Sequence, residues 1–286
     1  MIDANALQYA PPDPERDAAD RLGRLHGALE LKAALLALLL PPGSRRALRA
    51  FEIETADIRP APTLQTHVTN LLPAARLPWF EALLGRMALH PLPLRQELLQ
   101  ATRRVMGARG QARPIDRLHW LAMRRGLGEN AGAPARGPAA GPGPVVADVS
   151  EWLDTDLQAI AIYSAFLSRM VPDDDAAGGD PRAALAWYEL VMEPWHGGIT
   201  LPGCEPPDGE GAVRALATLQ TLSLMQRPVL VRGWFTAATR QNGHRPLAPA
   251  AADALRLSAG LLDTPMPPEL AAQYIAIAPP LSQAAT

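Results

Sequence analysis

The fold of this 286-residue chain is indicated most clearly by the stretch LRQELLQATRRVMGARGQARPIDRLHWLAM, from Leu94 to Met123. Its first half places apolar residues at the spacing of one helical face: Leu94, Leu98, Ala101 and Val105. Gly107 and Gly110 are suited to end that helix, and Pro114 is suited to begin the next one. The stretch therefore predicts two amphipathic helices joined by a short turn.

The same spacing extends in both directions from this stretch. Upstream, we expect one long helix from residue 14 to Leu40, a Pro-punctuated loop from Ile58 to Thr66, and a helix through Leu77 to Met87. Downstream, helices are predicted to begin near these residues: Ser150, Pro181, Ala212, Gln226, Pro249 and Pro267. No convincing run alternates with a period of two, so we predict an all-α fold.

A second stretch, RPVLVRGWFTAATRQNGHRPLAPAAADALRLSA from Arg227 to Ala259, repeats the order of helix, glycine-centred turn and proline-initiated helix. Residues 128–144 (GENAGAPARGPAAGPGP) separate the two copies and are typical of a linker. We therefore predict two related multi-helix halves, 14–127 and 145–278, joined by this Gly/Pro/Ala-rich linker. Residues 1–13 and 279–286 are expected to be flexible ends.

The helical pattern followed by LLDTPMPPEL, from Leu261 to Leu270, resembles the cytosolic C-terminal helical region of bacterial M48-type metallopeptidases. That region is similar to the TerB-like helical domain of tellurite resistance. The segment RLPWFEALLGRM, from Arg76 to Met87, resembles its earlier half, and the resemblance covers residues 70–126 and 150–275 in outline. It implies TerB-like bundles that serve as a binding or regulatory module, with a membrane-associated or stress-related partner.

The chain departs from this pattern in two places. It has no HExxH sequence, which supplies the zinc ligands of the peptidase. TerB-like domains usually carry an acidic residue before the turn glycine, where this chain has Arg109 and Asn242. The first departure argues against a zinc peptidase, and the second against a metal or ligand role for the turn.

Composition excludes several classes of protein. Apolar residues make up 48% of the chain and charged residues 20%, which is typical of a globular protein. The formal net charge of −2 is unlike that of a general nucleic-acid binder, and Lys32 is the only lysine. Cys204 is the only cysteine, which fits a reducing compartment. Since the run from Ala33 to Leu40 is too short to cross a bilayer, we expect a cytoplasmic protein without a transmembrane segment.

Charge is distributed unevenly along the chain. Between Arg95 and Arg125 there are eight arginines and two acidic residues, whereas between Val145 and Glu193 there are ten acidic residues and two arginines. These segments are predicted either to dock on each other or to contact different partners. With the aromatic end of a helix at Trp195 and His196, the candidate partner surface contains these residues: Arg95, Arg103, Arg104, Arg109, Arg113, Arg117, Trp195 and His196.

The sequence lacks the common catalytic patterns: GxxxxGK[ST], GxGxxG after a strand, and GxSxG. Cys204 could act with His196 as a nucleophile and base, but Glu205 disfavours its thiolate. The aspartates at 173–175 and Asp180 fit a loop and a helix cap better than a cation site. We therefore expect a non-enzymatic, cofactor-free protein-interaction module. The alternatives are a metal- or ligand-sensing TerB-like protein, a hydrolase using Cys204, and a membrane-peripheral protein.

Overall fold

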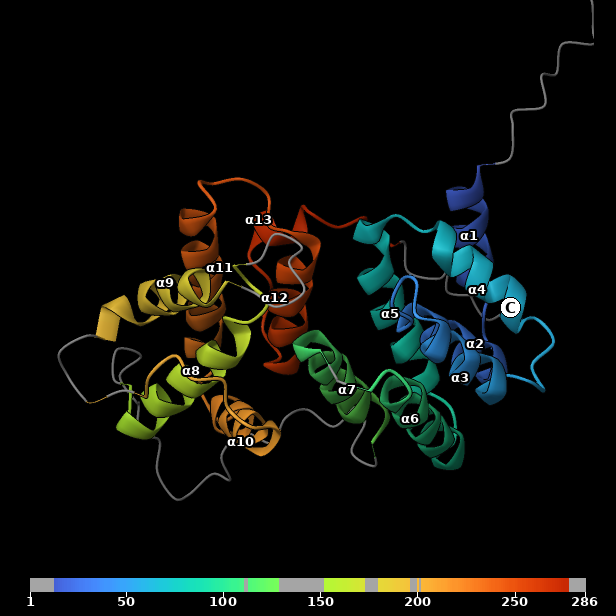
Figure 1. Ribbon diagram of the computed structural model, residues 1–286, viewed down its shortest axis with the longest axis horizontal. Helices are drawn as coiled ribbons and strands as arrows, with labels where there is room; N and C mark the ends of the chain where they lie inside the picture. Colours follow the sequence, from blue (N-terminus) through green and yellow to red (C-terminus); the bar gives the residue numbers. More distant parts are fainter. Residues whose placement is uncertain are drawn as a thin grey trace, which may run out of the picture.

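The computed structural model in Figure 1 describes residues 13–110, 113–128, 152–172, 180–195, 200 and 202–277. Within these ranges the chain forms 13 α-helices and one short 3-10 helix, and it forms no strand. The predicted all-α fold is confirmed. The predicted linker after Gly128, the N-terminal lead before Asp13 and the C-terminal tail lie outside the described residues.

The helices before the linker form one group, shown in blue to green in Figure 1. Its members are α1 (Pro14–Gly23), α2 (Ala28–Leu38), α3 (Arg45–Glu54), α4 (Ala61–Asn70), α5 (Pro73–Ala88), α6 (Leu92–Gly107) and α7 (Pro114–Leu127). The central helix α2 is buried along almost its whole length and packs against α4, α5 and α6. This explains why its sequence is apolar on every side.

The helices after the linker form a second group, shown in yellow to red. They are α8 (Asp154–Leu167), α9 (Pro181–Met192), η1 (Glu193–Trp195), α10 (Gly209–Leu219), α11 (Gln226–Gln241), α12 (Pro249–Leu261) and the four-residue α13 (Pro268–Ala271). Helix α8 is the buried element here, packed between α9 and α10. Trp187 and Trp234 are fully buried beside it, and the indole of Trp234 donates to Ser164 Oγ at 2.9 Å.

The predicted single helix from residue 14 to Leu40 is wrong, because the chain breaks between Gly23 and Ala28. The guanidinium of Arg86, on α5, explains this break. Its Nη1 atom donates to the carbonyls of Leu22, Gly23 and Leu25 at 2.9–3.2 Å. Backbone N–H groups of Arg24 and Leu25 also donate to carbonyls of this turn, and the contact with Arg86, distant in sequence, adds to them and stabilises the break.

The predicted loop from Ile58 to Thr66 is also wrong, because residues from Ala61 onward form α4. Its prolines lie at Pro60, the N-cap, and at Pro62, in the first turn, where no backbone N–H is needed. The helix predicted to begin near Pro267 was expected to continue to Ile277, but α13 ends at Ala271. Ser150 lies outside the described residues, and α8 begins at Asp154.

The two groups meet where α7 and α5 pack against α12, and the buried core is continuous from Ala18 to Leu270. Figure 1 shows α7 in the middle of the molecule, between α6 and α12. Arg125 on α7 donates to the carbonyl of Leu261 and to the carboxylate of Asp263, at the end of α12. The two groups are therefore joined by apolar packing and by a charged contact.

Two hairpins have the order that the sequence predicted, α6–α7 and α11–α12. The first turn contains Gly110, with φ of 90°, and the second contains Gly243, with φ of 62°. Both angles lie in the left-handed region that glycine adopts without strain. The shared local plan is confirmed, whereas the descent of the two halves from one repeat stays a prediction.

Candidate functional site

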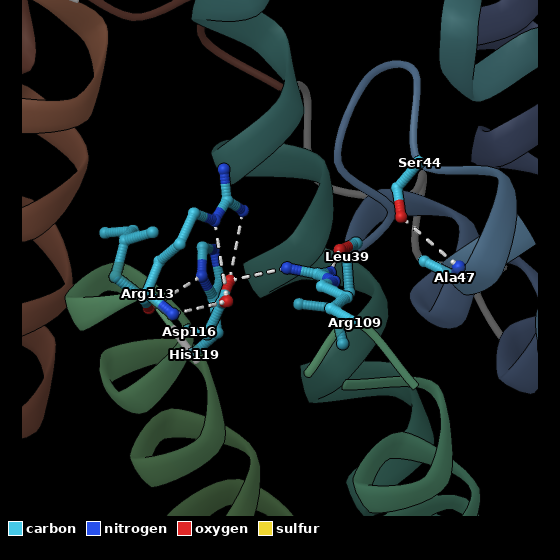
Figure 2. A network of polar contacts seen from close by, with 8 residues as sticks. Leu39, Ser44, Ala47, Arg109, Arg113, Asp116 and His119 are labelled. Carbon is cyan, nitrogen blue, oxygen red and sulfur yellow. Dashed lines mark hydrogen bonds and ion pairs between the residues drawn. The ribbon is translucent and has the colours of Figure 1, made fainter. Parts of the chain in front are cut away.

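A network of charged side chains holds the turn between α6 and α7 (Figure 2). Asp116 Oδ1 accepts from Arg109 Nη1 at 2.8 Å and from Arg113 Nη2 at 3.0 Å. Asp116 Oδ2 accepts from the backbone N–H of Arg113 at 3.1 Å, which caps the first turn of α7. Arg109 also donates to the carbonyl of Leu39 at the end of α2. The network therefore ties three helices together.

Arg109 belongs to the interior of this network. Its side chain is 7% exposed and that of Asp116 is 6% exposed. Burial opposes ionisation of Asp116, but the hydrogen bonds and positive charges of Arg113 and Arg109 outweigh it, so the pKa of Asp116 lies below its usual value. Arg109 was expected on a partner surface, and the structure gives it a structural position instead.

His119 lies beside the network but contacts a backbone carbonyl and an aromatic ring. Its Nδ1 atom is 3.1 Å from the carbonyl of Ile115, and its ring meets Phe80 edge to face at 5.2 Å. Removal from water lowers the pKa of His119 to about 4. The imidazole is therefore neutral at physiological pH and packs as an aromatic ring.

The outer side of the hairpin carries the positive charge that the sequence led us to expect. The guanidinium of Arg103, on α6, lies 4.7 Å above the ring of Trp120, on α7. Arg117 and Arg124 flank Trp120 at helical spacing and are exposed, and the Arg113 side chain is 53% exposed. We call this surface the basic face: Arg103, Arg113, Arg117, Trp120 and Arg124.

Two predicted residues point elsewhere. Arg104 forms a two-pronged ion pair with Glu54 on α3, with Nη2 to Oε2 at 2.7 Å. Arg95 donates from Nη1 to the carbonyl of Gly128 at 3.0 Å, which closes the end of α7. Both side chains therefore hold the first helical group together and do not belong to the basic face.

Trp195 is separate from the basic face. It lies in η1, which follows α9 on the left of Figure 1, whereas α6 lies on the right. Its ring meets Trp152 edge to face, with centroids 5.6 Å apart. Trp195 is half-buried by this contact, and the neighbouring His196 lies outside the described residues. The structure thus does not unite the two parts of the predicted surface.

The thiol of Cys204 contacts neutral oxygen atoms, and Arg169 donates to its backbone carbonyl at 3.4 Å. Its Sγ atom lies 3.4 Å from Ser168 Oγ and 3.7 Å from the carbonyl of Ala184. Asp180 caps α9 by accepting from the N–H of Arg182 at 2.9 Å, as predicted, while residues 173–175 lie outside the described part. In that part of the chain, no three His, Cys, Asp or Glu side chains are placed to hold a metal ion.

Sequence reasoning missed a polar cluster where α5, α12 and the segment after α13 meet. Glu81 on α5 and Arg256 on α12 form a two-pronged ion pair with distances of 2.6–3.1 Å. Tyr274 donates to Asp253 Oδ1 at 2.9 Å. The guanidinium carbon of Arg256 lies 4.4 Å from the centre of the Tyr274 ring. No local pattern could reveal this cluster, because Glu81 and Arg256 are 175 residues apart.

Asp253 has the most perturbed carboxyl group of this cluster. Burial raises its pKa to about 7, and the charge of Glu81 adds to the effect. The hydrogen bond from Tyr274 and the charges of Arg256 and Arg76 act in the opposite direction but do not cancel it. We therefore expect the ionisation of Asp253 to affect the contact between the two helical groups.

Comparison of the chain with protein-family models, with curated proteins and with solved structures finds no match. In the described part of the chain, none of the helices has the length and apolar character needed to span a membrane.

Proposed function

We propose that this protein is a non-enzymatic helical interaction module that binds an acidic protein segment through the basic face. The observation that carries the proposal is the stacking of Arg103 on Trp120, between the exposed Arg117 and Arg124. In the described part of the chain, none of these three arginines forms an ion pair with a carboxylate. All three side chains are exposed, so a partner can reach them.

The chemistry of the face favours a protein partner with carboxylates around an apolar anchor. Arginine and tryptophan are enriched at the energetic centres of protein interfaces, and a guanidinium held by an aromatic ring is already oriented for a carboxylate. The charged network at the turn between α6 and α7 supports the basic face, because Asp116 connects the N-terminal end of α7 to α2 through Arg109. A rigid support reduces the entropy lost on binding.

The test reverses charge on the face without disturbing the fold. The variant Arg103→Glu, Arg117→Glu, Arg124→Glu is compared with the control Arg16→Glu, Arg59→Glu, Arg182→Glu. The control arginines are exposed, and in the described part of the chain their side chains form no ion pair. Both variants change net charge equally. Binding of a fluorescent peptide with alternating Glu and Leu is measured at low and moderate salt.

We expect the wild type and the control to bind the peptide at low salt, and the variant to lose about tenfold or more in affinity. Binding should weaken as salt rises. Equal binding by variant and control would refute the proposal. If a DNA or RNA fragment of similar charge bound more tightly than the peptide, the partner of the basic face would be a nucleic acid and not a protein.

A relation to TerB-like helical bundles remains a second, structural part of the proposal. It is supported by the order of helix, left-handed glycine turn and proline-initiated helix in both hairpins. Asn242 donates to the carbonyl of Pro246 at 2.9 Å, so its side chain supports the turn.

A further inference from the structure

A groove of about 460 Å³ lies between α11, the loop that follows it, and α13. Phe235 and Pro246 provide apolar surface in it, and its polar lining includes Arg232, Thr236, Arg245 and Glu269. In Figure 1, α11 lies on the left and α6 on the right, so the groove is separate from the basic face. Its volume is within the range of small-molecule sites.

Hydrogen bonds stabilise the loop that forms one wall of the groove. The N–H of His244 donates to the carbonyl of Thr239 at 2.7 Å, and Asn242 Nδ2 donates to the carbonyl of Pro246 at 2.9 Å. His244 has φ of 60°, a left-handed conformation that residues with a side chain rarely adopt. These contacts hold the backbone of Arg245 at the groove before any ligand is bound.

The charged groups of the groove are not neutralised by one another. Arg232, Arg245 and Glu269 are exposed, and none of them forms an ion pair within the described ranges. Arg240, on the same helix, shows the contrast, because it donates to Glu193 at 3.1 Å. The groove therefore offers two guanidinium groups that lack a carboxylate partner in the described part of the chain.

We propose that this groove binds a small organic anion, with a carboxylate or phosphate group between Arg232 and Arg245 and an apolar body against Phe235. A guanidinium binds both groups through paired N–H donors, and two of them discriminate an anion from a neutral ligand. Phe235 is 8% exposed, so it belongs to the core and only a small part of it borders the groove. Glu269, on α13, carries the opposite charge and weakens binding of an anion without a donor group.

The experiment uses the full chain and three probes: phenyl phosphate, benzoate and inorganic phosphate. Each is titrated by calorimetry at low ionic strength. We expect phenyl phosphate to bind with a dissociation constant of about 1 mM. Inorganic phosphate should bind several-fold more weakly, because it lacks the phenyl ring that makes the apolar contact. The affinity of benzoate shows whether the groove prefers a carboxylate or a phosphate.

Two variants and a control make the test specific. Arg232→Gln with Arg245→Gln should weaken phenyl phosphate about tenfold or more, whereas Arg59→Gln with Arg182→Gln, which removes the same charge elsewhere, should leave it unchanged. Glu269→Gln should tighten it about two- to fivefold, because a like charge is removed. These side chains are exposed, so the variants should unfold at the wild-type temperature.

The inference is overturned by either of two results. One is the absence of saturable binding of all three probes up to about 20 mM, an affinity too weak for a specific site. The other is an equal loss of affinity in the groove variant and in the control, which would show that arginines anywhere on the surface attract the anion. Since the basic face is not involved, failure here leaves the proposed interaction module untouched.

Discussion

The α6–α7 and α11–α12 hairpins have the same local plan but bury their carboxylates in opposite electrostatic surroundings. Asp116, on α7, contacts two guanidinium groups directly, and its pKa is lowered. Asp253, on α12, lies near Arg256, but that guanidinium is already bound to Glu81, and the pKa of Asp253 is raised to about 7. Burial favours the neutral form of both carboxyl groups; the hydrogen bonds and charges of Arg113 and Arg109 outweigh it at Asp116, whereas the contacts of Asp253 do not.

The comparison shows that a hairpin's local plan does not fix its electrostatics. In the first hairpin, the ion pairs of Asp116 stabilise the turn, and Arg109 also contacts the end of α2. The second uses a backbone hydrogen bond and the side chain of Asn242 at its turn. Its buried charges lie instead on α12, where they meet the first helical group. In the described part of the chain, Arg232 and Arg245 form no ion pair, and both line a groove.

The largest expected effect is on the first hairpin. Asp116→Ala leaves the buried guanidinium of Arg109 without its carboxylate, and we expect it to lower the free energy of unfolding by about 3–5 kcal/mol at pH 7. The contribution of Asp116 is present above its unfolded pKa of 3.8 and is lost as pH falls through its lower folded value. Urea unfolding followed by circular dichroism measures the change.

The matched variant in the second hairpin is Asn242→Ala. It removes one neutral hydrogen bond at the turn, so we expect a loss of about 1 kcal/mol. Equal losses for the two variants would mean that the charged network stabilises its turn no more than the neutral contact does, and the comparison would fail.

The second prediction concerns the raised pKa of Asp253. Because the folded state holds this proton more tightly than the unfolded state, stability should fall as pH rises from about 4 to about 7. Asp253→Asn imitates the protonated acid and can still accept from Tyr274. It should raise the free energy of unfolding at pH 8, by at most about 4 kcal/mol, and change it little near pH 4.

Urea unfolding of wild type and Asp253→Asn at both pH values isolates this group from the histidines, which titrate in both proteins. A stability difference that is the same at pH 4 and pH 8 would show that Asp253 ionises normally. The two hairpins would then not differ in the electrostatics of their carboxylates.

The smallest effect tests what the hairpins share. Gly110→Ala and Gly243→Ala each force a side chain into a left-handed conformation, and each should cost about 1–2 kcal/mol. Gly107→Ala is the control, because Gly107 ends α6 without a positive φ and with open space around it. It should be neutral or stabilise by up to about 1 kcal/mol. Thermal unfolding measures all three, and a large difference between the two turn variants would contradict the shared plan.

Helix type and most helix positions could be predicted from local sequence. The apolar spacing of Leu98, Ala101 and Val105 and the initiating prolines Pro114 and Pro249 act over a few residues, so the sequence displays them. The break after α1 could not be predicted in this way, because Arg86 supplies the partners of its carbonyls from 61–64 residues away. The same limit applies to Glu81 and Arg256.

The candidate surface was predicted only in part for the same reason. The number of arginines indicated the segment from Arg95 to Arg125. It did not indicate which of their guanidinium groups are buried or paired with a carboxylate of the same chain. Arg104 is exposed but paired with Glu54, Arg109 is buried against Asp116 and Leu39, and Arg103 lies over Trp120. The groove at Arg232 and Arg245 was not predicted, because its walls come from two helices and a loop.

The sequence by itself determined the all-α class, the two glycine-centred hairpins and an excess of positive charge on one of them. These depend on backbone conformation, helical periodicity and residue type, which act locally. Only the tertiary structure decided which charges are buried, which pKa values shift, and which arginines remain available to a ligand or partner. Those properties depend on distance and on exclusion of water, and both are set by residues far apart in the chain.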